Sequence, residues 1–143
     1  MYNVALDVDD LQFQSKPYDG PLAYSQTKRA EVELASFWAK QYPDRFFYSM
    51  HPGWAETPGL AFSLPKFNSM MASYLRTPEQ GADTIVYAAI SPQITRDTRI
   101  PNGSFLFDRL SADQHLSFAG TKVDESKCKT LCEKLDEILN KVL

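Results

Sequence analysis

The sequence contains few of the residues that build disulfide frameworks or metal centres. Two cysteines, Cys128 and Cys132, lie four residues apart, which fits neither a disulfide framework nor the two-residue gap of a redox or zinc pair. The two histidines, His51 and His115, are too far apart in the chain to define a metal site. We therefore expect no bound metal, and we expect the two thiols to pack on one face of a helix.

Long apolar runs and blocks of basic residues are also missing. No stretch approaches the roughly 20 apolar residues that cross a bilayer, and the N-terminus turns acidic where a secretory signal would be basic and then apolar. Lys and Arg number 15 against 18 Asp and Glu, and they form no cluster that could neutralise a row of phosphates. These absences predict no membrane span, no nucleic-acid partner and a cytoplasmic setting.

The apolar pattern that is present predicts several helices. Apolar residues recur at three- and four-residue steps over 22–41, which predicts an amphipathic helix that Pro43 ends. Thr77, Pro78 and Gln80 form the sequence pattern of a capped helix over 78–90. A weaker helix is expected over 67–75, and an apolar stripe predicts a last helix over 128–142.

Two buried strands are predicted between these helices, at 45–50 and 104–108, and the alternation at 2–8 predicts a short strand or an extended loop. Helices alternating with strands are typical of parallel strands joined by crossover helices. With two or three short strands and about four helices, residues 1–143 are expected to form a single, partial α/β domain. The bare sheet edges of such a domain favour a homodimer or a swapped assembly.

Two motifs give the chain a resemblance to a known family. Tyr24-Ser25-Gln26-Thr27-Lys28 lies in the first predicted helix, and Pro52-Gly53-Trp54-Ala55-Glu56-Thr57 follows the first predicted buried strand. Together they resemble the signature of the short-chain dehydrogenases/reductases. His51-Pro52-Gly53-Trp54 and Gln80-Gly81-Ala82-Asp83 most resemble the branch of that family called family member twelve. The resemblance covers essentially the whole chain and implies the C-terminal part of a Rossmann-like, doubly wound parallel sheet.

The resemblance implies an oxidoreductase that uses NAD or NADP on a small carbonyl or alcohol substrate. Tyr24 would be the acid/base, and Lys28, one helical turn later, would favour the phenolate of a group whose ordinary pKa is about 10. Lys28 would also bind the nicotinamide ribose. Pro52 and Gly53 would let the backbone approach a flat ligand at the end of a parallel strand. The resemblance assigns further nicotinamide contacts to the backbone of Ala55 and the hydroxyl of Thr57. The expected cofactor-binding residues are therefore Lys28, Pro52, Gly53, Ala55 and Thr57.

Two parts of the family pattern are not found. The sequence has no glycine-rich turn for a dinucleotide pyrophosphate, and the catalytic Ser of the family would fall before Met1. We therefore expect a truncated enzyme, made by alternative start or splicing or reflecting an incomplete gene model, that binds no dinucleotide tightly and is inactive alone. The alternative is a non-catalytic protein-interaction module derived from the same fold.

Two further interpretations concern the segments after the first strand. The apolar residues of segment 60–76 match in position the variable substrate lid of the family, and they would suit a lipophilic substrate, lid packing or an oligomer surface. His51 and Ser49 would also suit a hydrolase, but the sequence has no Gly-x-Ser-x-Gly elbow to support that alternative.

Overall fold

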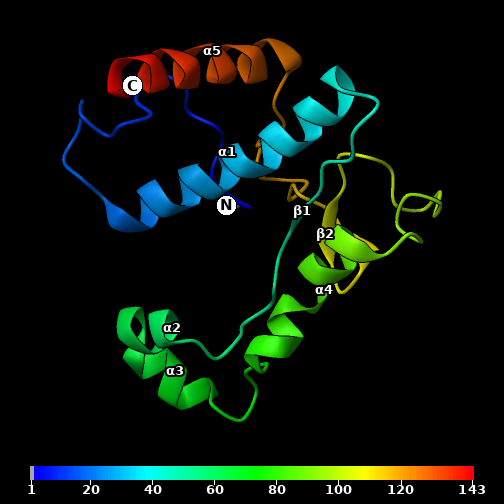
Figure 1. Ribbon diagram of the computed structural model, residues 1–143. Helices are drawn as coiled ribbons and strands as arrows, with labels where there is room; N and C mark the ends of the chain where they lie inside the picture. Colours follow the sequence, from blue (N-terminus) through cyan, green and yellow to red (C-terminus); the bar gives the residue numbers. More distant parts are fainter. Residues whose placement is uncertain (1) are drawn as a thin grey trace.

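The computed structural model, which describes residues 2–143, contains a three-stranded sheet and five helices (Figure 1). Strand β1 (Ser49–Met50) pairs in parallel with β2 (Phe105–Phe107), and β3 (Leu110–Ser111) returns antiparallel to β2. The α/β class is therefore confirmed, with one helix more than the sequence suggests and with an antiparallel third strand that makes the sheet mixed. That strand exists because the chain reverses tightly after β2.

Helix α1 (Gly20–Gln41) begins where the Asp19 side chain accepts a hydrogen bond from the N–H of Leu22, at 2.9 Å. Such a cap satisfies a backbone donor that the first turn would otherwise leave free. Pro43 stands two residues beyond the end of the helix, in agreement with the predicted stop. The second half of α1 is tied to the loop before β2, because the Ser36 hydroxyl donates to the carbonyl of Gly103 at 2.9 Å.

Helix α5 (Glu125–Val142) packs along α1, and the N-terminal segment lies against both helices (Figure 1). The core at this junction consists of Leu6, Val8, Leu34 and Leu131. Leu6 and Val8 pair with no strand among the described residues, so residues 2–8 form a loop rather than the strand. The apolar stripe of α5 is buried only in its first half, since Leu139 and Val142 are exposed.

Helix α4 (Pro78–Ile90) forms with the predicted boundaries. The Thr77 hydroxyl accepts from the N–H of Gln80 at 3.3 Å, and the Gln80 side chain accepts from the N–H of Thr77 at 2.9 Å. These reciprocal bonds confirm the capping pattern read from the sequence. A second core, around Ile94, Ile100 and Leu106, lies between α4 and the sheet.

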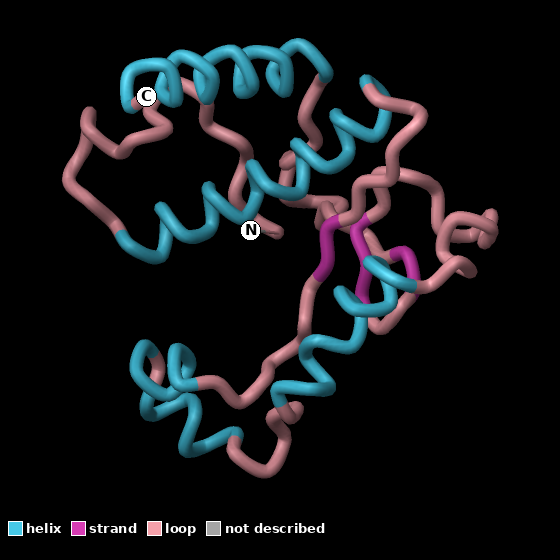
Figure 2. Tube along the Cα trace, viewed as in Figure 1, coloured by secondary structure: helices cyan, strands magenta, loops and turns pink. Residues whose placement is uncertain are grey.

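The helical segment after β1 starts earlier than predicted and is split in two. Helix α2 (Pro58–Ser63) is capped by Thr57, and helix α3 (Pro65–Met71) begins at a proline two residues after α2 ends. Because proline fits the first turn of a helix but not its interior, Pro65 ends one helix and starts the next. Figure 2 shows this pair standing apart from α1 and α5.

The aromatic run before β1 is the largest error in the predicted strands. Only Ser49 and Met50 pair with β2, and residues 45–48 reach the sheet as irregular backbone. Phe46 is 56% exposed, so the expectation of a strand buried on both faces is wrong there. No helix among residues 2–143 combines the length and the apolar character needed to span a bilayer.

Candidate active site

Tyr24 and Lys28 lie next to each other on the solvent-facing side of α1. The ammonium of Lys28 is 5.9 Å from the centroid of the Tyr24 ring, as expected for residues one helical turn apart. Tyr24 is 67% exposed, so the pair lies at the surface rather than in a closed recess. The Lys28 ammonium also donates to both carboxylate oxygens of Glu31, at 3.0 and 2.9 Å. The structure thus brings Tyr24 and Lys28 together. It also places beside them the Glu31 carboxylate, which was not predicted from the sequence.

Pro52 and Gly53 follow β1 after one residue, His51, at the C-terminal end of a strand that is paired in parallel. Gly53 has a φ of +75°, a conformation that residues with a side chain rarely adopt. Its N–H donates to Nδ1 of His51 at 2.9 Å. A Cβ added to Gly53 would lie 2.7 Å from Nε of Arg76, so the guanidinium covers this face of the loop.

Arg76 holds the same loop through its backbone. Its N–H donates to the carbonyl of Trp54 at 2.8 Å, and its carbonyl accepts from the N–H of Glu56 at 2.8 Å, which forms a parallel bridge opposite Ala55. In such a bridge the N–H and C=O of Ala55 itself point away from Arg76. Within residues 2–143 these two groups have no protein partner, and Ala55 therefore offers one donor and one acceptor to a ligand.

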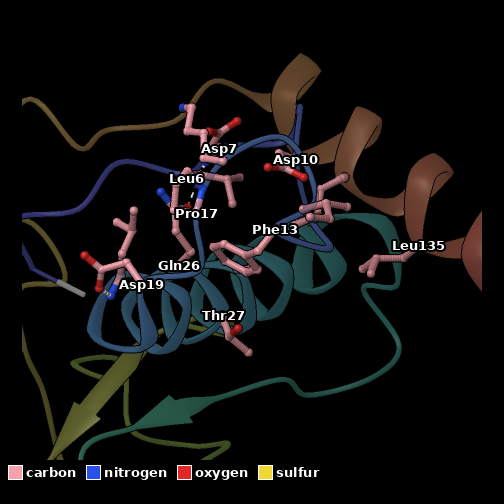
Figure 3. Close-up of a pocket in the computed structure, with 14 residues that line it drawn as sticks. Leu6, Asp7, Asp10, Phe13, Pro17, Asp19, Gln26, Thr27 and Leu135 are labelled. Atoms are coloured by element: carbon pink, nitrogen blue, oxygen red, sulfur yellow. Dashed lines mark hydrogen bonds between the residues drawn. The ribbon is translucent and has the colours of Figure 1, made fainter.

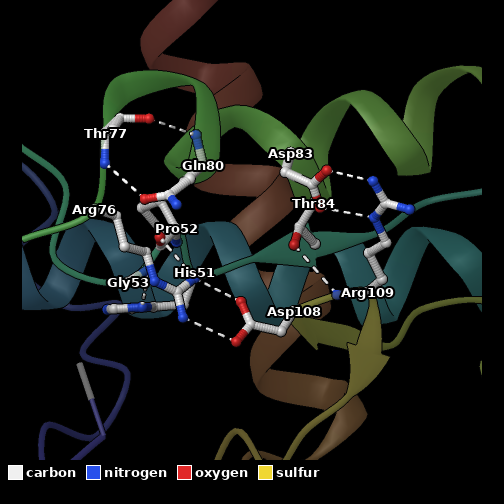
Figure 4. Close-up of polar contacts among 10 residues, drawn as sticks. All are labelled: His51, Pro52, Gly53, Arg76, Thr77, Gln80, Asp83, Thr84, Asp108 and Arg109. Carbon is white, nitrogen blue, oxygen red and sulfur yellow. Dashed lines mark hydrogen bonds and ion pairs between the residues drawn. The ribbon is translucent and has the colours of Figure 1, made fainter.

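The guanidinium of Arg76 is in turn fixed by the turn between β2 and β3 (Figure 4). Its two terminal nitrogens bond the two carboxylate oxygens of Asp108 at 2.5 and 2.8 Å, and its carbon lies 5.0 Å from the centroid of the Phe107 ring. The hydrogen bonds from Arg76 lower the pKa of Asp108. Arg76 also donates to the carbonyl of Pro52 at 3.4 Å.

The turn residues themselves adopt an unusual backbone conformation. Asp108 and Arg109 have φ values of 51° and 63°, the left-handed conformation that two-residue hairpins require and that Asn-Gly normally supplies. Arg109 forms a bidentate ion pair with Asp83 of α4, and its N–H donates to the Thr84 hydroxyl at 3.2 Å. Ion pairs with distant residues thus hold both strained residues. These pairs were not predicted from the sequence, because Asp108 is 32 residues from Arg76 and Arg109 is 26 residues from Asp83.

Thr57 lies at the N-terminus of α2. Its hydroxyl oxygen accepts from the N–H of Leu60 at 3.1 Å, which makes Thr57 the cap of that helix. The hydroxyl proton is not used by this bond and can still be donated. Thr57 therefore serves the local fold and keeps one group for a ligand.

His51 contributes to the loop rather than to a catalytic pair with Ser49. Burial, and then the charge of Arg76, lower the pKa of His51. Because Nδ1 accepts from Gly53, the neutral ring carries its proton on Nε2. No hydrogen bond joins His51 to Ser49 in the described part of the chain, where the Ser49 hydroxyl is buried without a partner. The hydrolase alternative therefore lacks the contact it needs.

Behind the exposed face of α1 lies a buried polar cluster that the sequence did not suggest. Arg29 is fully buried and bonds Oε1 of Glu33 at 3.2 Å and the carbonyl of Gln114 at 3.0 Å. Nδ1 of His115 lies 3.4 Å from Arg29 and 3.0 Å from the Thr121 hydroxyl, so His115 is part of this cluster. Burial raises the pKa of Glu33 and lowers that of His115.

A cavity of about 200 Å³ lies between the N-terminal segment, α1 and α5 (Figure 3). Gln26 and Thr27 line it, whereas Tyr24 and Lys28 do not. At roughly 100° of rotation per helical residue, Gln26 lies on the opposite side of α1 from Tyr24 and Lys28, and Thr27 lies between the two sides. The candidate catalytic pair therefore does not line this cavity. No group of three or more His, Cys, Asp or Glu that could hold a metal is found among residues 2–143.

Comparison with known proteins finds partial relatives. Over 133 residues, which is 93% of this chain, the sequence is 38% identical to dehydrogenase/reductase SDR family member 12 of Bos taurus and 37% identical to the protein of that name from Homo sapiens. A Streptomyces protein provisionally named daunorubicin C-13 ketoreductase is 31% identical over 73% of this chain. The chain spans 41% of the length of the two mammalian relatives. No family model and no solved structure matches.

Proposed function

We propose that this chain supplies the proton-transfer pair of an NAD(P)-dependent carbonyl or alcohol oxidoreductase. The chain is a homologue of the C-terminal portion of a short-chain dehydrogenase/reductase, and it belongs to that family. The observation that carries the proposal is the placement of the Lys28 ammonium 5.9 Å from the Tyr24 ring on an accessible helix face. The relatives' names indicate dehydrogenase or reductase chemistry in those proteins.

In this proposal Tyr24 transfers the proton. Its phenol gives a proton to a substrate carbonyl during reduction, or its phenolate takes one from an alcohol during oxidation. A cation beside a phenol favours the phenolate, which is the role of Lys28. The Lys28–Glu31 ion pair is exposed at both ends, so it is weak and readily exchanged for a ligand contact.

The loop after β1 fits the nicotinamide part of the cofactor. A carboxamide carries one acceptor and one pair of donors, and Ala55 presents a free N–H and a free C=O on the side away from Arg76. The Thr57 hydroxyl retains a proton to donate, and Lys28 would bind the ribose hydroxyls. When bound, the dinucleotide supplies or accepts the hydride.

We further propose that the chain acts only together with a separate nucleotide-binding part, since it spans 41% of the length of its mammalian relatives. The groups assigned to the cofactor all contact its nicotinamide end, and so few contacts leave little surplus over the entropy lost on binding. The isolated chain is therefore expected to bind NAD and NADP weakly and to show no turnover.

One observation favours the second candidate, a non-catalytic interaction module. Tyr24 is 67% exposed, and Lys28 is hydrogen bonded to Glu31, an arrangement typical of an ordinary solvent-facing helix. In this case the exposed face of α1 would contact a protein partner instead of a substrate.

The test joins this chain to the part of the Bos taurus relative that lies outside the aligned region, and it follows NADH or NADPH consumption with a panel of carbonyl substrates. Tyr24→Phe should lower kcat by at least about a hundredfold, the usual contribution of a general acid. Tyr18→Phe is the matched control, since Tyr18 is 74% exposed and precedes the helix. Equal activity of the Tyr24→Phe and Tyr18→Phe proteins would refute the catalytic role and favour the interaction module.

A further inference from the structure

Helices α2 and α3 form a helical hairpin, residues 57–75, that stands away from the main body of the protein. The two helices pack mainly on each other, and Figure 2 shows them at a distance from α1 and α5. The Trp54 ring contacts the Phe67 ring with centroids 4.6 Å apart and ring planes tilted by 51°. This contact joins the base of the hairpin to the loop after β1.

The outer surface of this hairpin is strongly apolar. Phe62 is 89% exposed, Met70 is 71% exposed and Tyr74 is 78% exposed, and Leu64 between the helices is also exposed. No residue of either helix is buried. Large apolar side chains that gather on a projecting element usually mark a contact surface for a partner or a membrane.

The charge of the hairpin differs from that of the whole chain. No acidic residue occurs between Glu56 and Glu79, although the chain carries 18 acidic residues and a net charge of −3. The two basic residues in this interval are Lys66 and Arg76, and Arg76 is neutralised by Asp108. Lys66, at the start of α3, forms no ion pair within residues 2–143. The hairpin thus presents apolar and aromatic groups, one unpaired cation and no anion.

We propose that the hairpin docks on the surface of an anionic lipid bilayer, without crossing it. Phe62, Leu64, Met70 and Tyr74 enter the boundary between headgroups and acyl chains, and Lys66 meets the anionic headgroups. A bilayer surface can accommodate a small, irregular apolar projection, because the bilayer needs no complementary shape of its own. The negative charge of its headgroups suits a segment that contains no acidic residue. This inference does not depend on the proposed role of Tyr24 and Lys28.

The experiment measures co-sedimentation of the 143-residue chain with phosphatidylcholine vesicles that contain or lack phosphatidylserine. Phe62→Ser should lower the partition coefficient about tenfold, because one large apolar side chain no longer enters the lipid. Adding Met70→Ser should lower it about tenfold again. Lys66→Ala should weaken binding about fivefold, and only on vesicles with phosphatidylserine.

Phe118→Ser is the matched control. Phe118 is 84% exposed on the loop before α5, so its replacement removes the same apolar group from another surface and should leave vesicle binding unchanged. All the substituted positions are exposed, and thermal melts by circular dichroism should confirm that each variant stays folded. In a Trp38→Phe background, brominated acyl chains should quench the remaining Trp54 at the base of the hairpin.

Three outcomes would overturn the proposal. The first is no binding to vesicles that contain phosphatidylserine. The second is equal loss of binding in Phe62→Ser and Phe118→Ser, which would indicate nonspecific adsorption. The third is self-association of the chain that Phe62→Ser weakens and that added vesicles do not reduce. This result would make the hairpin a contact between two copies.

Discussion

Replacing Arg29 tests whether the buried polar cluster on α1 holds the fold together. Arg29→Met removes a fully buried cation and keeps much of the apolar stem, while the Glu33 carboxylate stays buried at 7% side-chain exposure without its counter-ion. Breaking one side of a buried ion pair typically costs about 3–5 kcal/mol. A cost near the middle of that range corresponds to a fall in Tm of roughly 10 °C for a chain of this size.

The measurement is urea unfolding followed by far-UV circular dichroism, with the slope of each transition compared between variants. Lys28→Met is the control, since Lys28 is the neighbouring residue and its ion pair with Glu31 is exposed at 42% and 55%. Exposed pairs contribute about 0–1 kcal/mol, so this variant should unfold almost as the parent does. The double variant Arg29→Met, Glu33→Leu should be more stable than Arg29→Met alone, because no charge is left buried.

The pH dependence of the Arg29→Met defect adds a second check. Burial already raises the pKa of Glu33, and without Arg29 it should rise further. A group whose pKa is raised in the folded state takes up protons that the unfolded state does not, so lowering the pH toward the ordinary Glu range should reduce the defect. A loss below about 1 kcal/mol at neutral pH, or strict additivity of the two substitutions, would refute the reasoning.

Three further predictions concern single positions. Gly53→Ala should destabilise the protein by more than about 1 kcal/mol, because Gly53 has a positive φ and the Arg76 guanidinium covers it. Gly59→Ala, at an open position in α2, is the control and should not lower the urea midpoint; equal midpoints for the two variants would contradict the prediction. Burial raises the pKa of the Cys128 thiol to about 11, so in a Cys132→Ser background Ellman's reagent should leave Cys128 unmodified until urea unfolds the chain, and fast reaction of that folded variant would contradict this. Burial lowers the pKa of His51 and His115, so the unfolded chain binds more protons below about pH 6.5 and stability should fall from pH 7 to pH 6; a flat or rising urea midpoint in that window would contradict the burial of both rings.

The features predicted well from the sequence depend on neighbours a few residues apart. The capping bonds of α4 join Thr77 to Gln80, and the adjacency of Tyr24 and Lys28 follows from helical spacing alone. The proline that separates α2 from α3 could also have been read from the sequence, because Pro65 cannot sit inside a helix. The roles of Tyr24, Lys28, Ala55 and Thr57 stay predictions, which the hybrid-enzyme experiment tests.

The features that were missed depend on residues far apart in the chain. The aromatic side chains at 45–48 suit a buried strand, but pairing with β2 extends only to Ser49, and no sequence pattern shows where a ladder stops. The contact of His115 with Arg29 was not predicted because the two residues are 86 positions apart in the chain. The antiparallel return to β3 uses Asp108 and Arg109 in place of the usual Asn-Gly, so the turn carried no recognisable signal.

The sequence by itself determined helices α1, α4 and α5, the cap of α4, the α/β class and the placement of a phenol and an ammonium one turn apart. Only the tertiary structure decided that Arg76 fixes the loop around Gly53, that Arg29 is buried with Glu33, and that the hairpin of α2 and α3 projects with its apolar side chains outward. The physical reason is the range of the interactions. Capping and helical spacing act within one or two turns of the chain, whereas burial and ion pairing depend on which distant segments the fold brings together.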